Sequence, residues 1–130
     1  MIIGIGTDIV QMERIKQLYE KHDKSFINRI LHPEEIKQLA KKKTTKQIIG
    51  FISKRFAGKE AIAKALGTGI GDDISFVDIL IENNSKGRPI VKLDTEEFKE
   101  YKEYKFNISL SDDYPIAVAF AVITIDTQDK

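Results

Sequence analysis

The stretch from Thr44 to Gly71, TTKQIIGFISKRFAGKEAIAKALGTGIG, decides the fold of this chain. Thr44 and Gln47 have the spacing of a capping box, in which each side chain satisfies a free backbone N–H group of the first helical turn. Gly67 is the residue type that adopts the left-handed conformation just after a helix. The sequence therefore predicts one long helix between these residues, roughly 30 Å in length at about 1.5 Å per residue.

The apolar residues of this helix recur at intervals of three and four, which predicts an amphipathic helix with one buried face. These residues are Ile48, Ile49, Ile52, Phe56, Ala63 and Leu66. The polar side carries Glu60 and Lys64 one turn apart, with Arg55 and Lys59 on the neighbouring stripe. A solvated Glu60–Lys64 pair, worth about a few tenths of a kcal/mol, is the plain alternative to a functional site.

The charge around Glu60 favours a functional role for this residue. Between Lys37 and Lys64 there are nine lysines and arginines, and Glu60 is the one acid. The whole chain carries a net charge of +1, but residues 37–71 carry +8, residues 1–36 carry −1 and residues 72–130 carry −6. This distribution suits an anionic partner bound at one place, and it argues against a surface that coats nucleic acid uniformly.

The length and composition indicate a single domain over residues 1–130, with 42% apolar residues to build its core. There are no cysteines, so disulfides and thiolate metal sites are excluded, which fits a cytoplasmic protein. No apolar run is long enough to span a membrane, and no signal peptide is evident. We therefore expect a soluble intracellular protein with no membrane partner.

A strand is predicted from Met1 to Val10, where β-branched residues alternate with Gly4 and Gly6. We expect Asp8 to lie near the end of this strand. A charged residue beside apolar neighbours must be paired, exposed or bound to a cation. The alternative for Asp8 is that it caps the next turn.

Three helical segments are predicted next, from Gln11, from Lys24 to Leu31 and from Pro33 to about Ala40. The first two place basic side chains on their exposed sides, where solvated surface is the default interpretation. An acidic protein partner could dock there, and the candidates are Arg14, Lys21 and Lys24.

After the long helix, the glycines of Gly67–Gly71 match neither a P-loop nor the dinucleotide-binding fingerprint. Their N–H groups could approach a phosphate, but taken alone a flexible helix cap is the preferred explanation. The remaining chain is rich in strands, which predicts an α+β domain. The expected elements are strands over 74–82, 89–93, 106–110 and 116–125, and a helix over 94–102.

Several motifs in this order resemble the holo-[acyl-carrier-protein] synthase family, the small phosphopantetheinyl transferases. They span nearly the whole chain, and their combination is more specific than any one of them. The motifs are Gly6-Thr7-Asp8-Ile9-Val10, Glu13-Arg14-Ile15, Arg55-Phe56-Ala57-Gly58-Lys59-Glu60-Ala61 with Lys64, Ala65-Leu66-Gly67-Thr68-Gly69-Ile70-Gly71, and Gly87-Arg88-Pro89.

The resemblance implies transfer of 4′-phosphopantetheine from coenzyme A to a serine of apo-acyl carrier protein, as in fatty acid biosynthesis, with release of adenosine 3′,5′-bisphosphate. It implies a long central helix packed on a curved, mainly antiparallel sheet, a homotrimer with coenzyme A bound between subunits, and Mg²⁺ bound by Asp8 and Glu60. Two carboxylates plus phosphate oxygens and water suit Mg²⁺. We expect Glu60 and Lys64 to be catalytic. The residues expected to contact coenzyme A are Arg55, Lys59, Lys64, Gly67 and Gly69.

One position departs from the family pattern. Where the family has Ser-x-Ser-His, this chain reads Ser109-Leu110-Ser111-Asp112, and an aspartate cannot donate a hydrogen bond to a phosphate as a histidine does. The alternative from another functional class is a nonenzymatic module whose basic segment 37–64 binds RNA or another polyanion. The two carboxylates argue against it, because they repel phosphate unless a metal intervenes.

Overall fold

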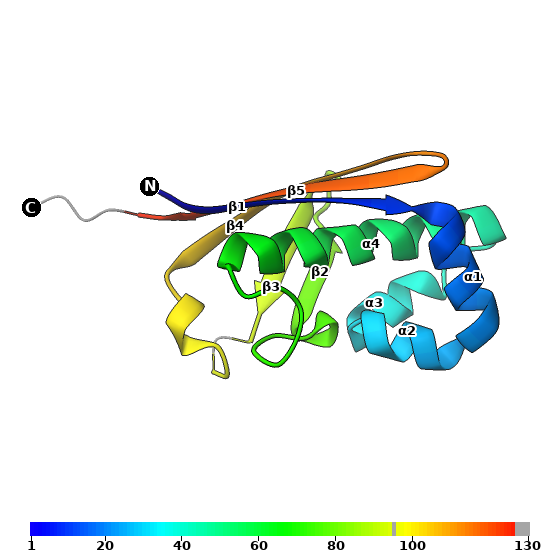
Figure 1. Cartoon of the computed structure of the whole chain (residues 1–130), viewed down its shortest axis with the longest axis horizontal. Helices are drawn as coiled ribbons and strands as arrows, with labels where there is room; N and C mark the ends of the chain where they lie inside the picture. The colour runs from blue at the N-terminus through cyan, green and yellow to red at the C-terminus, as the bar shows by residue number, and fades with distance from the viewer. Residues whose placement is uncertain (95, 127–130) are drawn as a thin grey trace, which may run out of the picture.

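The computed structural model describes residues 1–94 and 96–126. Helix α4 (Thr45–Leu66) runs through the centre of the molecule (Figure 1). At its start, Thr44 Oγ1 accepts a hydrogen bond from the Gln47 backbone N–H at 3.1 Å, and Gln47 Oε1 accepts one from the Thr44 N–H at 3.3 Å. At its end, Gly67 adopts a φ of 83°. Both predicted ends of the helix are therefore confirmed.

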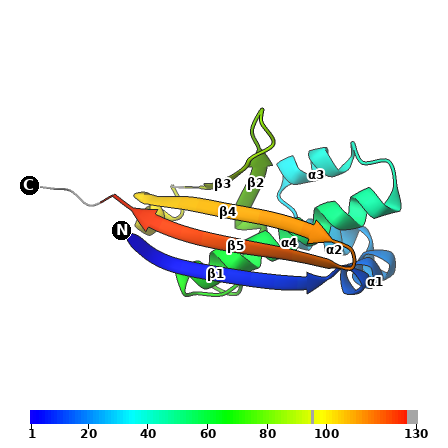
Figure 2. The same cartoon turned by 90° about the horizontal axis from the view of Figure 1, so that it is seen from above.

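A three-stranded antiparallel sheet lies along one side of α4 (Figures 1 and 2). Its strands are β1 (Ile2–Gln11), β4 (Tyr104–Asp113) and β5 (Ile116–Ile125), in the order β1-β5-β4. The start of β1 and the end of β5 meet at one end of the molecule, where the Met1 ammonium donates to the Ile125 carbonyl at 2.9 Å. The central helix on an antiparallel sheet confirms the expected α+β fold.

Small residues allow the sheet to approach α4 closely. Gly6 of β1 pairs with Ala121 of β5, and Ala117 and Ala119 lie on the same inner face. A Cβ atom at Gly6 would overlap the carbonyl oxygen of Ala61 in α4. The glycines of β1 thus permit a backbone-to-backbone contact that a side chain would prevent.

The other elements cover the remaining sides of α4. Three short helices gather at one end of the molecule, and the β2–β3 hairpin lies beside β4 and along the flank of α4 (Figures 1 and 2). The helices are α1 (Met12–His22), α2 (Lys24–Ile30) and α3 (Pro33–Leu39), and the hairpin strands are β2 (Ile79–Asn83) and β3 (Pro89–Leu93). In the described part of the chain, no helix combines the length and the apolar character needed to cross a membrane.

This enclosure corrects the expectation of an amphipathic central helix. The middle of α4 is buried on nearly all sides, and even Arg55 and Lys59 are 4% and 0% exposed. Glu60 is partly exposed and Lys64 is exposed. Periodicity predicts which residues share a face, but it does not show how many faces the rest of the chain will cover.

Two other predictions were wrong in part. The expected strand over 74–82 begins only at Ile79, because Phe76–Asp78 form a 3₁₀ turn closed by a hydrogen bond from Ser75 N–H to Asp78 Oδ2 at 2.8 Å. The expected helix over 94–102 is replaced, among its described residues, by turns and a short 3₁₀ helix at Lys99–Tyr101.

Candidate functional site

Asp8 lies on the face of β1 that meets α4, two residues after Gly6. The strand continues to Gln11, so Asp8 lies inside the strand and not at its end as expected. Its side chain is 15% exposed. Its Oδ1 atom accepts a hydrogen bond, whereas its Oδ2 atom is buried without a partner. A buried, unpartnered carboxylate oxygen indicates a place for a cation or a donor that binds from outside the chain.

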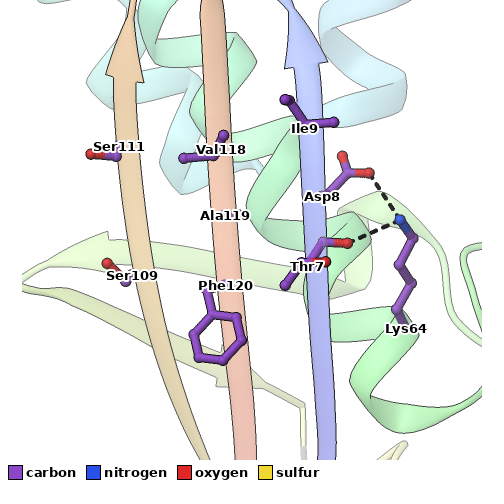
Figure 3. Close-up of a pocket in the computed structure, with 9 residues that line it drawn as sticks. All are labelled: Thr7, Asp8, Ile9, Lys64, Ser109, Ser111, Val118, Ala119 and Phe120. Carbon is purple, nitrogen blue, oxygen red and sulfur yellow. Dashed lines mark hydrogen bonds and ion pairs between the residues drawn. The ribbon is translucent and has the colours of Figure 1, made fainter.

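Lys64 extends from α4 to the edge of β1 (Figure 3). Its ammonium lies 3.1 Å from Asp8 Oδ1 and donates to the backbone carbonyl of Thr7 at 3.0 Å. The ion pair that Lys64 forms is therefore with Asp8, while the alternative from sequence paired it with Glu60. This contact joins the two elements that carry the candidate site.

Glu60 lies one turn before Lys64 and shares a cavity with it and with Asp8. Burial raises the pKa of the Glu60 carboxyl, the nearby Asp8 carboxylate raises it further, and Lys64 opposes both effects. Two acids from distant parts of the sequence thus converge, as predicted. The cavity is also lined by Gln11, Arg14, Ile15, Leu18 and Phe56.

The donor set of this cavity fits a small divalent cation. In the described residues, no group of three or more His, Asp and Glu side chains gathers to enclose a metal. Mg²⁺ commonly takes only one or two carboxylates and completes its shell with water and substrate phosphate oxygens. Asp8 with its free oxygen and Glu60 with its raised pKa supply the two carboxylates that such a shell requires.

Lys59 lies away from this cavity, contrary to the expectation that it faces a ligand. Its ammonium donates to the Glu35 carboxylate and to the Ile30 carbonyl, and the side chain is fully buried. Burial lowers the pKa of Lys59, and Glu35 opposes that shift. Because its donors are used inside the protein, Lys59 is not available to a phosphate at the surface.

Arg55 opens onto a second cavity, which is rich in cations. Its guanidinium stacks 4.5 Å from the Phe51 ring centre, its buried Nε atom has no hydrogen-bond partner, and burial lowers its pKa. Asp112 is the acid in the lining and lies 3.2 Å from the Lys54 ammonium. The other cations that line this cavity are Lys42 and Lys46, which lie just before and at the start of α4.

The structure gives Gly67 and Gly69 a capping role. The Gly67 N–H donates to the Lys64 carbonyl at 3.0 Å, and the Gly69 N–H donates to the Ala63 carbonyl at 3.1 Å. These groups are therefore not free to bind a phosphate in this conformation. The helix-cap alternative accounts for both glycines.

The three candidate docking residues differ in position. Arg14 lines the cavity that holds Glu60, whereas Lys21 and Lys24 are exposed farther along, at the end of α1 and the start of α2. Arg14 is thus the one candidate that the structure brings to the cavity, and we refer to Arg14, Lys21 and Lys24 together as the basic margin. Their role in docking stays a prediction.

The fold and this site define a small α+β protein with two carboxylates and a lysine at one cavity. Comparisons with known proteins identify the family. The family model of the 4′-phosphopantetheinyl transferase superfamily matches residues 4–119. A holo-[acyl-carrier-protein] synthase of Orientia tsutsugamushi (strain Boryong) is 48% identical over 132 residues, which cover 98% of this chain and 100% of that protein.

Solved structures give the same result. The holo-[acyl-carrier-protein] synthase of Neisseria meningitidis matches with a TM-score of 0.86 and 37% identity, over 95% of this chain and 99% of that one. The Helicobacter pylori synthase in complex with coenzyme A matches with a TM-score of 0.82 and 34% identity, over 92% of this chain and 99% of that one. The chain therefore belongs to the 4′-phosphopantetheinyl transferase superfamily.

Proposed function

We propose that this protein transfers the 4′-phosphopantetheine group of coenzyme A to a serine of apo-acyl carrier protein. The serine oxygen forms a bond to the phosphorus next to the pantetheine, the bridging P–O bond breaks, and adenosine 3′,5′-bisphosphate leaves with the electron pair. The observation that carries this proposal is the convergence of Asp8, Glu60 and Lys64 on one cavity. The relatives named holo-[acyl-carrier-protein] synthases support the choice of substrates.

Asp8 and Glu60 would hold Mg²⁺, which the donor set of the cavity fits. The free Oδ2 atom of Asp8 supports this assignment. When bound, the ion would neutralise the negative charge that builds up on the pyrophosphate. Lys64, already at the edge of β1, would place its ammonium against a phosphate oxygen as a point charge.

Glu60 would accept the proton of the attacking serine. Neither histidine of the chain lines the cavity that holds the two carboxylates. In the metal-free protein, burial and then the Asp8 carboxylate raise the pKa of Glu60, and with a metal bound the proton would pass to Glu60 directly or through a water.

The cationic cavity around Arg55 would bind the 3′-phosphate of coenzyme A. Arg55 lines a different cavity from Glu60, which supports a role at the 3′-phosphate and not at the pyrophosphate. Four cations with one acid make this lining strongly positive, and a planar guanidinium suits a phosphate dianion, although Arg55 Nε also lies 4.0 Å from the buried Glu35 carboxylate.

The outer face of the β1-β5-β4 sheet would be the contact surface of a homotrimer. Along β5, alanines point inward toward α4, while Val118 and Phe120 point outward and are 39% and 46% exposed. Ile5 and Ile9 on β1 extend the same apolar surface. A surface of this kind marks an interaction site. Because Asp8 and Lys64 also line the pocket on this face, a second subunit would help to enclose the ligand (Figure 3).

Acyl carrier protein would dock against the basic margin of Arg14, Lys21 and Lys24. Arg14 lies where the carrier serine must enter, since it lines the cavity of Glu60. Exposed cations of this kind increase the rate of encounter with an acidic partner.

Mass spectrometry of apo-acyl carrier protein incubated with the enzyme, coenzyme A and Mg²⁺ tests the proposal. We expect the carrier to gain the mass of one phosphopantetheine group, and omission of Mg²⁺ to prevent the gain. No gain, together with salt-sensitive RNA binding by the 37–64 segment, would instead support the polyanion-binding alternative.

A further inference from the structure

The interior of the protein contains an ion pair that the proposed reaction does not use. Lys59 and Glu35 are 0% and 1% exposed. The Lys59 ammonium donates to Glu35 Oε1 and, at 2.8 Å, to the carbonyl of Ile30 in the last turn of α2. The pair therefore links the centre of α4 to the neighbouring helices.

Glu35 extends the same network to two further backbone groups. Its Oε1 atom accepts the N–H of His32, just before α3, at 2.9 Å. Its Oε2 atom accepts the N–H of Ile81, in β2, at 2.8 Å, and lies 4.0 Å from Arg55 Nε, a second buried cation of α4. One lysine and one glutamate thus connect α2, α3, β2 and α4 through polar contacts that are directional.

The network meets α4 at the residue next to Glu60. On the neighbouring sides of the same turn, Gly58 packs against Ile81 and Ala61 packs against Gly6. Within this turn, Gly58 contacts the hairpin, Lys59 contacts the short helices and Ala61 contacts β1. Glu60 is the partly exposed residue of this turn, and it lines the cavity with Asp8.

Stability alone does not explain why charges occupy this position. Taking two charges out of water costs free energy, and replacing a buried ion pair by apolar side chains is often neutral or stabilising by about 1–4 kcal/mol. Apolar packing, however, tolerates small rotations of a helix that a set of directional hydrogen bonds resists.

We propose that Lys59 and Glu35 form a positioning pair, which fixes the rotation of α4 about its axis and so holds Glu60 and Lys64 opposite Asp8. The inference rests on the proposed transferase function of that site. It assigns to Lys59 a role without ligand contact. A displacement of about 1 Å at a reacting group can reduce a rate on the order of 100-fold. Rotation of α4 that moves Glu60 and Lys64 by this amount would therefore lower kcat.

The test is the double variant Glu35→Gln/Lys59→Met, which removes both charges and keeps similar side-chain volumes. We expect it to unfold cooperatively, and to show, at saturating coenzyme A, a kcat at least about tenfold lower than wild type with KM for acyl carrier protein changed by less than about threefold, as misplacement of the reacting groups predicts. A crystal structure should show Lys64 displaced from Asp8, which it contacts at 3.1 Å in the wild type.

The control is Phe98→Leu, which loosens a stacked aromatic pair with Tyr101 outside the network. Assayed at the same interval below its own Tm, this variant should keep the wild-type kcat. The proposal is overturned if the double variant keeps kcat within about twofold, or if the control loses as much activity. Should the double variant fail to fold, Lys59→Met alone, which leaves the Glu35 carboxylate beside Arg55 at 4.0 Å, is held to the same thresholds.

A failure of the proposed function would look different. If wild-type protein transfers no phosphopantetheine, the activity is wrong, and the position of Lys64 relative to Asp8 in the variant crystal structure decides the positioning role. An unchanged Lys64–Asp8 distance of 3.1 Å would then reject it.

Discussion

Lys64 Nζ lies 3.1 Å from Asp8 Oδ1, so a lysine of α4 contacts an aspartate that is 56 positions away on β1. The pair leaves the other oxygen of Asp8 without a partner and directs both residues to the cavity of Glu60. The contact between α4 and β1 therefore brings the residues of the site together.

The first prediction concerns the proposed base. Glu60→Gln should lower kcat by about 10²- to 10⁴-fold, because the amide cannot accept the serine proton and is a weaker metal ligand. The measurement is carrier modification at saturating coenzyme A and Mg²⁺. Near-normal turnover of this variant would show that another group is the base. Glu13→Gln, an exposed change on α1, serves as the control.

A second prediction tests the close approach of β1 to α4. Gly6→Ala places a methyl group into the carbonyl of Ala61, so the strand must move. Overpacking of this kind costs about 1–3 kcal/mol and occasionally more, and we expect the upper part of that range because the obstacle is backbone. Urea unfolding gives the value. Gly71→Ala is the matched control, since a Cβ at Gly71 would meet no heavy atom within 4 Å; equal effects of both changes would refute the close contact.

The raised pKa of Glu60 predicts a pH-dependent cost of folding in the metal-free protein. The ordinary value is 4.5, and burial followed by the Asp8 carboxylate raises the pKa in the folded state. The folded chain then holds the proton at pH values where the unfolded chain has lost it, so stability falls as the pH rises from 4.5 through the folded pKa. Glu60→Gln removes this dependence.

Unfolding free energies of wild type and Glu60→Gln at pH 4 and pH 7 provide the measurement, with about 1 mM EDTA to exclude metal binding. The two proteins should be similar at the lower pH, and the variant should gain relative to wild type at the higher pH. A difference that is constant across this range would contradict the cause assigned to the Glu60 pKa.

Reversal of charge at Arg14 should weaken carrier binding. Arg14→Glu is expected to raise KM for acyl carrier protein by about tenfold at low salt, with a smaller effect as salt screens the contact. Lys99→Glu makes the same charge change at the opposite end of the molecule from α1 and should have little effect (Figure 1). Unchanged kinetics of Arg14→Glu at low ionic strength would remove this residue from the docking surface.

The outer sheet face predicts the state of assembly. Phe120→Glu should give a particle with the mass of one chain in sedimentation equilibrium, because a buried, unpaired carboxylate at an interface costs several kcal/mol, on the order of the penalty for an isolated buried charge. Gln38→Glu, an exposed change on α3, introduces the same charge away from this sheet face and tests whether the effect is specific to it. A trimer that survives Phe120→Glu would place the contact elsewhere.

Much of the local structure could be predicted from the sequence. The capping box at Thr44 and the glycine at Gly67 determine the ends of α4, because they act on backbone groups only a few residues away. The hairpin strand Pro89–Leu93 and the strand Ile116–Ile125 also have the predicted bounds. The prediction of a helix over 94–102 was wrong: the described residues of this segment form turns and a short 3₁₀ helix, because helix propensity is a weak preference that tertiary contacts override.

The residue types and their order in the sequence by themselves determined the long helix, the α+β class and the pairing of Asp8 with Glu60 as candidates, since capping, alternation and the family motifs are properties of the chain read in order. The tertiary structure decided which charges face the ligand. It buried Lys59 against Glu35, 24 positions away, and opened Arg55 onto a separate cationic cavity. The physical reason is that the side of a helix left open to solvent depends on every element packed around it. The elements packed around α4 include β1, β4 and β5, which are distant from it in the sequence.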